Sequence, residues 1–245
     1  METFAKPPVR EAVVDIKAML PAAATAVDIL KIRDLLRPDY PRMDERAPWN
    51  AVVQLKPGEK VEGDSEVQKP DGYIFWTSDE SHAVQYRLDG FTFSQLRPYS
   101  GWEAMRGAAK RHWSIYVDKL HPVRVRRVAV RYVNLVNIPG VGVDLDDYVI
   151  GLPRIPKGFP QTVEQFLSRF IFPIPEVKGK ALVTLTLVPP EVPGMTSIVF
   201  DIDVFIEQAF DPVSASLWEM IETLRYHKNE IFSNTLTDKT KELFR

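Results

Sequence analysis

The chain contains no cysteine among its 245 residues. This absence excludes disulfide bonds, thiolate-ligated metals and cysteine nucleophiles, and it is typical of proteins in a reducing compartment. Runs of roughly 18 apolar residues, which a membrane-spanning helix requires, are also missing. The N-terminal segment METFAKPPVREAVVDI lacks the apolar core of a signal peptide. We therefore expect a soluble, cytoplasmic protein that does not associate with membranes.

A strong net charge is lacking too, because 31 basic residues face 33 acidic ones and give a formal charge of −2. No global field favours nucleic acid. The distribution is nevertheless uneven. The basic segment 106–131 carries eight Lys and Arg against Asp118 alone (+7), and the acidic segment 191–224 carries seven carboxylates and no basic residue (−7). We interpret these as two blocks that face each other within the fold or across a dimer interface.

The motifs of common catalytic and nucleotide-binding sites are absent as well. The sequence contains no HExxH, GxSxG, P-loop or GxGxxG pattern. Its four histidines, His82, His112, His121 and His227, have no metal-ligand spacing. No nucleophile, base and orienting carboxylate can be assembled from these residues. The sequence therefore predicts no cofactor and leans away from an enzyme.

The most informative segment that is present runs from Val123 to Ile138. Apolar residues occupy most positions of both alternating faces, which is typical of a strand in the middle of a sheet. The phase of the alternation changes at Arg126 and Arg127, where we expect a β-bulge or a bend.

Other elements follow from periodicity and turn signals. Val9–Met19, Ala51–Leu55, Tyr73–Thr77, Ala181–Val188 and Ser197–Ile206 are predicted strands, and Asp89-Gly90 predicts a hairpin whose two central residues have positive φ. Helices are predicted over 21–37, over 162–171 and from Thr237 to Phe244. A further helix is predicted to start at the Ser100/Glu103 capping box and to end at Leu120. Another is predicted to start at Asp211 as its cap, with Pro212 in the first position.

This order of elements predicts an α+β protein with a mostly antiparallel sheet and long helices covering one face. We expect residues 1–245 to form a single domain. The order also repeats, because 7–121 and 122–245 each read as a β-α-β-β-α unit with a tryptophan in its last helix. Residue identity between these halves is negligible, so the repeat is one of pattern.

Three short motifs occur in a fixed order along the chain: PPVREAV at 7–13, RYVN at 131–134, and Leu217-Trp218 followed by His227-Lys228-Asn229, Phe232 and Thr235-Leu236-Thr237. In order and spacing the chain resembles a sporadically distributed, uncharacterised prokaryotic protein family of about this length. The resemblance covers nearly the whole chain and implies one intact unit. It implies no activity, cofactor or catalytic residue.

Two candidate sites contain basic or amide side chains. Arg106, Lys110, Arg111, Arg127 and Arg131 form the candidate nucleic-acid cluster, because phosphate binding requires such a group of cations. The alternative is that these arginines pair with the acidic segment. Asn134 lies among apolar neighbours on the central strand, and we interpret it as a structural amide that satisfies a backbone group.

Carboxylates form a further candidate group. Asp201 and Asp203 project to the same side of one strand with Glu207 beyond them, and Asp144, Asp146 and Asp147 supply more oxygen atoms. Such a group could bind a divalent cation. The alternative, which we favour, is the charged solvent face of an alternating strand.

These observations leave the function open. A non-enzymatic binding or assembly module, which acts through a protein partner or self-association, is the hypothesis that we favour. The alternative is a nucleic-acid-associated protein, with genome defence as one such role. A hydrolase that uses the scattered carboxylates ranks third.

Overall fold

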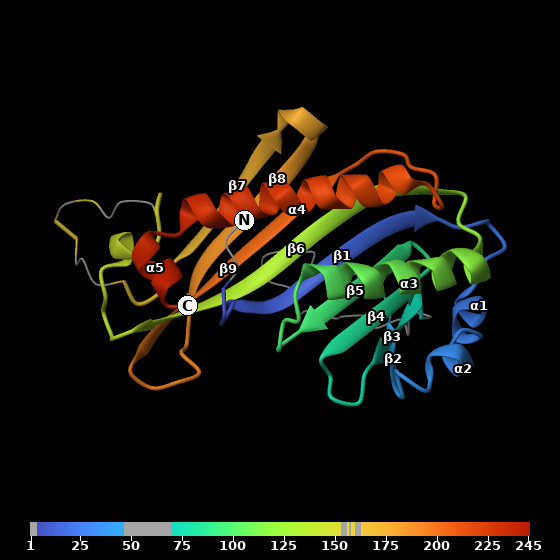
Figure 1. Cartoon of the computed structure of the whole chain (residues 1–245), viewed down its shortest axis with the longest axis horizontal. Helices are drawn as coiled ribbons and strands as arrows, with labels where there is room; N and C mark the ends of the chain where they lie inside the picture. Colours follow the sequence, from blue (N-terminus) through green and yellow to red (C-terminus); the bar gives the residue numbers. More distant parts are fainter. Residues whose placement is uncertain (1–3, 47–69, 153–155, 157, 160–162) are drawn as a thin grey trace, which may run out of the picture.

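The computed structural model describes residues 4–46, 70–152, 156, 158–159 and 163–245. These residues form a nine-stranded sheet with two long helices on one face (Figure 1). The strands are β1 (Val9–Met19), β2 (Arg42–Arg46), β3 (Gly72–Trp76), β4 (His82–Arg87), β5 (Gly90–Leu96), β6 (Arg124–Pro139), β7 (Leu167–Ile174), β8 (Gly179–Val188) and β9 (Met195–Ile206). The helices are α1 (Ala26–Leu30), α2 (Arg33–Leu36), α3 (Trp102–Leu120), α4 (Ala215–Thr235) and α5 (Asp238–Glu242), with short 3₁₀ turns η1 (Leu145–Asp147) and η2 (Pro175–Val177).

The strand order is β2-β3-β4-β5-β1-β6-β9-β8-β7, and every neighbouring pair is antiparallel. The α+β class and the antiparallel sheet are therefore confirmed. β6 lies in the interior, between β1 and β9. Lys17 pairs with Arg127 and Ala18 with Val125, so Arg126 is the extra residue of a β-bulge at the predicted position.

The two halves of the chain build the sheet in the same way. In the first half, β1 pairs with β5, the last strand before α3. In the second half, β6 pairs with β9, the last strand before α4. The halves meet where β1 and β6 run antiparallel at the centre. Between β6 and β7, the described residues of the second half form the 3₁₀ turn η1 and no α-helix, where the first half has α1 and α2.

Helices α3 and α4 cover the same face of the sheet (Figure 1). On α3, the predicted stripe Trp102, Met105, Ala109, Trp113, Tyr116 and Leu120 is buried. On α4, Leu217, Ile221 and Leu224 are buried toward the sheet. Their strand partners are the alternating apolar residues of β1, β6 and β9, and this layer between sheet and helices is the core. The other surface of the sheet is called here the opposite face.

The hairpin β4–β5 forms as predicted, but its turn differs. Arg87 pairs with Gly90, so Leu88 and Asp89 are the central residues and neither has positive φ. Gly90 has φ +151, and a Cβ on it would lie 2.2 Å from the backbone oxygen of Ile16. The glycine is therefore required because β5 passes close to β1, and not because of the turn type.

The predicted helix over 162–171 is wrong. Leu167–Ile174 is strand β7, which pairs with β8 along its whole length, and Thr162 lies outside the described residues. Its apolar residues fit helical spacing, but they also fit an edge strand that is exposed on both sides. Pro173 is compatible with an edge strand and would disrupt a helix that continued through it.

Three helix starts also differ from the prediction. The N-cap of α3 is Gly101, and Ser100 Oγ instead accepts a hydrogen bond from Gln95 Nε2 at 2.6 Å. Asp211 accepts from the Val213 amide in a turn, and α4 begins after Ser214. The region 21–37 forms two short helices rather than one. The Thr237 cap is confirmed, and the strand predicted over 51–55 lies outside the described residues.

The two ends of the described chain meet beside α4. Phe4 packs edge-on against Phe244 with 5.5 Å between ring centroids, and the Lys6 amide donates to the Phe244 carbonyl at 2.8 Å. Among the described helices, none is both long and apolar enough to cross a membrane.

Candidate functional site

Strand β7 is an outer strand of the sheet and carries large exposed apolar side chains. Leu167 is 71% exposed, Ile171 65%, Phe172 46% and Phe170 37%. The rings of Phe170 and Phe172 stack with 5.7 Å between centroids. In Figure 1 the β7–β8 hairpin extends beyond α4, so this part of the sheet lies outside the helix layer. We call the outer side of β7, with these four side chains, the apolar edge.

The outer strand at the other end of the sheet, β2, has the contrary character. Its sequence is RMDER. Arg42 pairs with Glu80 and Arg46 with Asp71, and the Arg42 guanidinium lies 4.7 Å from the Trp76 ring centroid. Charged side chains on an edge strand discourage pairing with another chain. The edge at β2 is therefore protected by charges against pairing with another chain, whereas the edge at β7 carries exposed apolar side chains.

The candidate nucleic-acid residues lie on two different faces. Arg106, Lys110 and Arg111 are on α3, and Arg106 Nε lies 2.7 Å from Glu222 Oε1 of α4. Arg127 and Arg131 are on β6 and point to the opposite face, where the alternation of the strand places them. The structure therefore brings together the first three residues and, separately, the last two.

Arg127 belongs to a row of ion pairs on the opposite face, which we call the ion-pair row: Arg87, Asp15, Arg127 and Asp203. Asp15 accepts from Arg87 at 2.9 Å and from Arg127 at 3.1 Å, and Arg127 donates to Asp203 at 3.2 Å. The Arg87 side chain is 8% exposed and the other three 18%. Burial raises the pKa of Asp203, although Arg127 and Arg131 act to lower it.

Ion pairs within the chain join the basic segment to the acidic segment. They are Arg106–Glu222, Arg127–Asp203 and Arg131–Asp201, the last with two guanidinium hydrogen bonds of 2.8 and 2.7 Å. The β6–β9 register opposes Arg131 to Asp203 and Val133 to Asp201, so the Arg131–Asp201 pair is diagonal. These arginines are thus partly neutralised before any ligand binds.

Three of the candidate carboxylates are paired with basic side chains. Asp201 and Asp203 accept from Arg131 and Arg127, and Asp147 lies 2.7 Å from Lys239 Nζ. Within the described ranges, no cluster of three or more His, Cys, Asp or Glu could hold a metal ion.

Asn134 is 1% exposed in the middle of the sheet. Its Nδ2 donates to the Phe200 carbonyl at 3.0 Å and to the Tyr132 carbonyl at 3.3 Å. The amide thus bonds to main-chain groups on β9 and on its own strand. This geometry supports the structural interpretation of Asn134, whose effect on stability stays a prediction.

Lys228 of α4 is a buried cation that the sequence analysis did not identify. It is 7% exposed, and its Nζ lies 3.8 Å from the centroid of the Tyr132 ring. No carboxylate pairs with it among the described residues. Burial lowers the pKa of Lys228, and together with the smaller effect of the nearby Arg225 it brings this pKa to about 7. The Tyr132 hydroxyl contacts that of Tyr99 at 2.8 Å.

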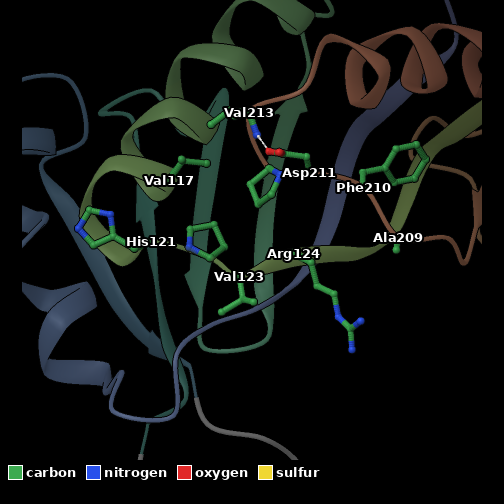
Figure 2. A pocket seen from close by; sticks show the side chains of 10 residues that line it. Val117, His121, Val123, Arg124, Ala209, Phe210, Asp211 and Val213 are labelled. Carbon is green, nitrogen blue, oxygen red and sulfur yellow. Dashed lines mark hydrogen bonds between the residues drawn. The ribbon is translucent and has the colours of Figure 1, made fainter.

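A hollow of about 560 Å³ lies where the end of α3 meets the loop between β9 and α4. Figure 2 shows that His121 and Arg124 on its rim point away from each other. Asp211 Oδ1 accepts from the Val213 amide at 2.9 Å, so this carboxylate stabilises the loop. The hollow therefore offers no assembled acid–base pair. A second hollow of about 410 Å³ is lined by Lys17, Asp89, Arg126, Arg127 and Glu207.

The apolar edge is the feature that sequence reasoning missed. The sequence analysis predicts Leu167, Phe170 and Ile171 in a helix, whereas the structure exposes them on a strand. The signal was present, because LSRFIFPI is an eight-residue run rich in aromatic and β-branched residues and contains a proline.

The pieces that carry the family resemblance lie together in the structure. The Leu135 amide donates to the Pro8 carbonyl at 2.8 Å, Val9 pairs with Asn134, and Lys228 contacts Tyr132. No protein-family model matches the chain, and no curated protein matches it. The resemblance therefore stays a prediction made from the sequence.

Proposed function

We propose that the protein is a non-enzymatic assembly module that binds a strand of a protein partner along the apolar edge. The observation that supports this most strongly is the exposure of Leu167, Phe170, Ile171 and Phe172 on an outer strand. A strand added there would cover these side chains and satisfy the outward backbone groups of β7 at the same time.

The physical basis is strand addition. An edge strand presents unpaired N–H and C=O groups, which form main-chain hydrogen bonds to an incoming strand. Side chains on alternate positions then provide specificity. Proteins that do not use an edge in this way usually protect it with charges, as β2 does. β7 has a single charged residue, Arg169, within eight positions.

The nucleic-acid alternative has less support. Arg106, Arg127 and Arg131 are engaged by carboxylates, and the five candidate cations are split between two faces. A continuous basic surface is what phosphate binding requires. The hydrolase hypothesis has less support still, because Asp201 and Asp203 are held by arginines.

The test is site-specific photo-crosslinking in cells that express the chain. A photoreactive residue in place of Ile171 should give covalent protein adducts, whereas the same residue in place of Val141, which is 82% exposed, should give none. Adding F170K and F172K should abolish the adducts at position 171, because two charges would then occupy the contact surface.

Two results would contradict the proposal. One is the absence of protein adducts at position 171. The other is adducts that persist unchanged with F170K and F172K. Retention of the purified chain on heparin that falls steeply with salt would favour the nucleic-acid alternative instead.

A further inference from the structure

We infer that the strand bound along the apolar edge is β7 of a second copy of the same chain, paired antiparallel about a two-fold axis through Ile171. This inference rests on the proposed function, because it names the partner that the apolar edge binds. It adds the identity of that partner, the direction of the strands and the register of the pairing.

Symmetry restricts the register. Two antiparallel edge strands from identical chains are related by a two-fold axis perpendicular to the sheet. This axis keeps α3 and α4 of both copies on the same side of the joined sheet. Residues directly opposite each other must then share a face, so one residue of β7 lies opposite its own copy.

The side chains of β7 favour Ile171 as that central residue. In this register Phe170 of each copy lies opposite Phe172 of the other. The stacked rings of the two chains therefore form one cluster of four rings. Arg169 lies opposite Pro173, which has no backbone N–H and therefore leaves no unpaired donor in the new pair of strands. Like-charge contact is also small, since the two Arg169 residues are offset by four positions along the strands.

Neighbouring registers are less favourable. A centre at Arg169 places two guanidinium groups directly opposite each other. A centre at Phe170 places Phe172 opposite Ser168 and brings the two arginines within two positions of each other. Pairing of β7 with β2 of a second copy would set apolar side chains against the charged sequence RMDER, whose Arg42 and Arg46 already have partners within their own chain.

The available area indicates a moderate affinity. The exposed parts of the four side chains amount to an apolar area on the order of 400 Å² per copy. A standard stable interface buries about 800 Å² per partner. Main-chain hydrogen bonds between the two β7 strands, and contacts of the residues beside them, add to the free energy gained from burying the apolar side chains. We therefore expect a dimer with a dissociation constant in the micromolar range, so that its population depends on protein concentration.

The absence of cysteine makes a sharp test possible, because single substitutions introduce the only thiol of the chain. The test variant is I171C and the matched control is L167C. Both residues lie on the same face of β7, and they are 65% and 71% exposed. In the proposed register two Ile171 residues are adjacent, whereas two Leu167 residues lie roughly 26 Å apart along the strands.

The measurement is the rate of covalent dimer formation with a short bis-maleimide, together with the molar mass from light scattering. I171C should crosslink at least about tenfold faster than L167C, because the thiols have a high effective concentration at the axis. The chain with its natural sequence should shift from monomer to dimer up to about 100 µM. The double variant F170K/F172K should stay monomeric with an unchanged circular dichroism spectrum.

Equal crosslinking rates for I171C and L167C would overturn the register and therefore the inference. A chain that stays monomeric across that concentration range would overturn it as well. If the photo-crosslinker at position 171 still captures a different protein, the proposed function stands and only the identity of the partner is wrong. If it captures none, both fail.

Discussion

The ammonium group of Lys228 lies 3.8 Å from the centroid of the Tyr132 ring, which joins helix α4 to the central strand β6 inside the protein. A cation is stabilised there by the ring and destabilised by its removal from water. Loss of solvation has the larger effect, so the pKa of Lys228 falls from 10.5 to about 7.

This low pKa predicts a pH-dependent stability. The unfolded chain keeps the Lys228 proton up to about pH 10.5, whereas the folded chain loses it near pH 7. Between these values the unfolded state binds more protons, so the free energy of unfolding should rise with pH, by at most about 1.4 kcal/mol per unit. Urea unfolding from pH 7 to about pH 9 should show this rise, and K228M should abolish it.

The control is K110M, which removes an exposed lysine on α3. Its stability should follow the same pH curve as the unmodified chain. Curves for K228M and the unmodified chain that run parallel would show that Lys228 does not titrate in this range.

Asp15 should be the most sensitive member of the ion-pair row. It accepts hydrogen bonds from Arg87, Arg127 and Thr92, at 2.9, 3.1 and 2.7 Å. D15N removes the carboxylate that Arg87 and Arg127 share, although Arg87 keeps Asp89 and Arg127 keeps Asp203 as partners. We expect a loss of about 2 kcal/mol in the free energy of unfolding. The exposed pair of Asp118 and Lys119 serves as the comparison, and D118N should cost less than about 1 kcal/mol.

A pair of glycine substitutions should have opposite effects. G90A places a methyl group 2.2 Å from the Ile16 carbonyl oxygen, at a backbone φ of +151. Since neither β1 nor β5 can move freely in the sheet, we expect a loss of at least about 2 kcal/mol. G107A meets no atom within 4 Å on helix α3 and should gain about 0.5–1 kcal/mol from helix propensity. Thermal unfolding of both variants checks this, and equal changes would contradict it.

Asn134 should contribute to stability rather than to ligand binding. N134A removes donors to the Phe200 and Tyr132 carbonyls in a site that is 1% exposed, and it leaves a small void. The expected cost is about 1–3 kcal/mol, measured as a lower denaturation midpoint. An unchanged midpoint together with loss of a partner would instead assign Asn134 to a binding site. S114A on the exposed side of α3 is the neutral control.

The interior of the fold was predictable because burial imposes a period on the sequence. The alternation of Val123–Ile138 indicated a central strand and the change of phase indicated the bulge at Arg126. The stripe on α3 was equally clear, since every one of its predicted core residues is buried. Burial on one side leaves a pattern that can be recognised without knowing the neighbouring elements.

The apolar edge was not predictable by the same logic. Its apolar side chains point to both sides of an outer strand, so period two and helical spacing fit equally well. Lys228 follows Leu224 by one helical step on the buried stripe of α4, so its burial could have been predicted from spacing, whereas its contact with Tyr132 could not. The division of the arginines between two faces likewise required the position of α3 relative to β6.

The seam between β1 and β6 has a consequence for biosynthesis. As the chain emerges from the ribosome, β1 can pair with β5 once the first half is made, but its other side must wait for β6, more than a hundred residues later in the sequence. During that delay the backbone groups on the unpaired side of β1 have no strand partner. The apolar side chains of β1, such as that of Val13, can then contact other nascent chains. Because the central pairing of β1 with β6 forms last, we expect slow refolding at high protein concentration. We also expect the nascent chain to depend on a holdase chaperone during translation.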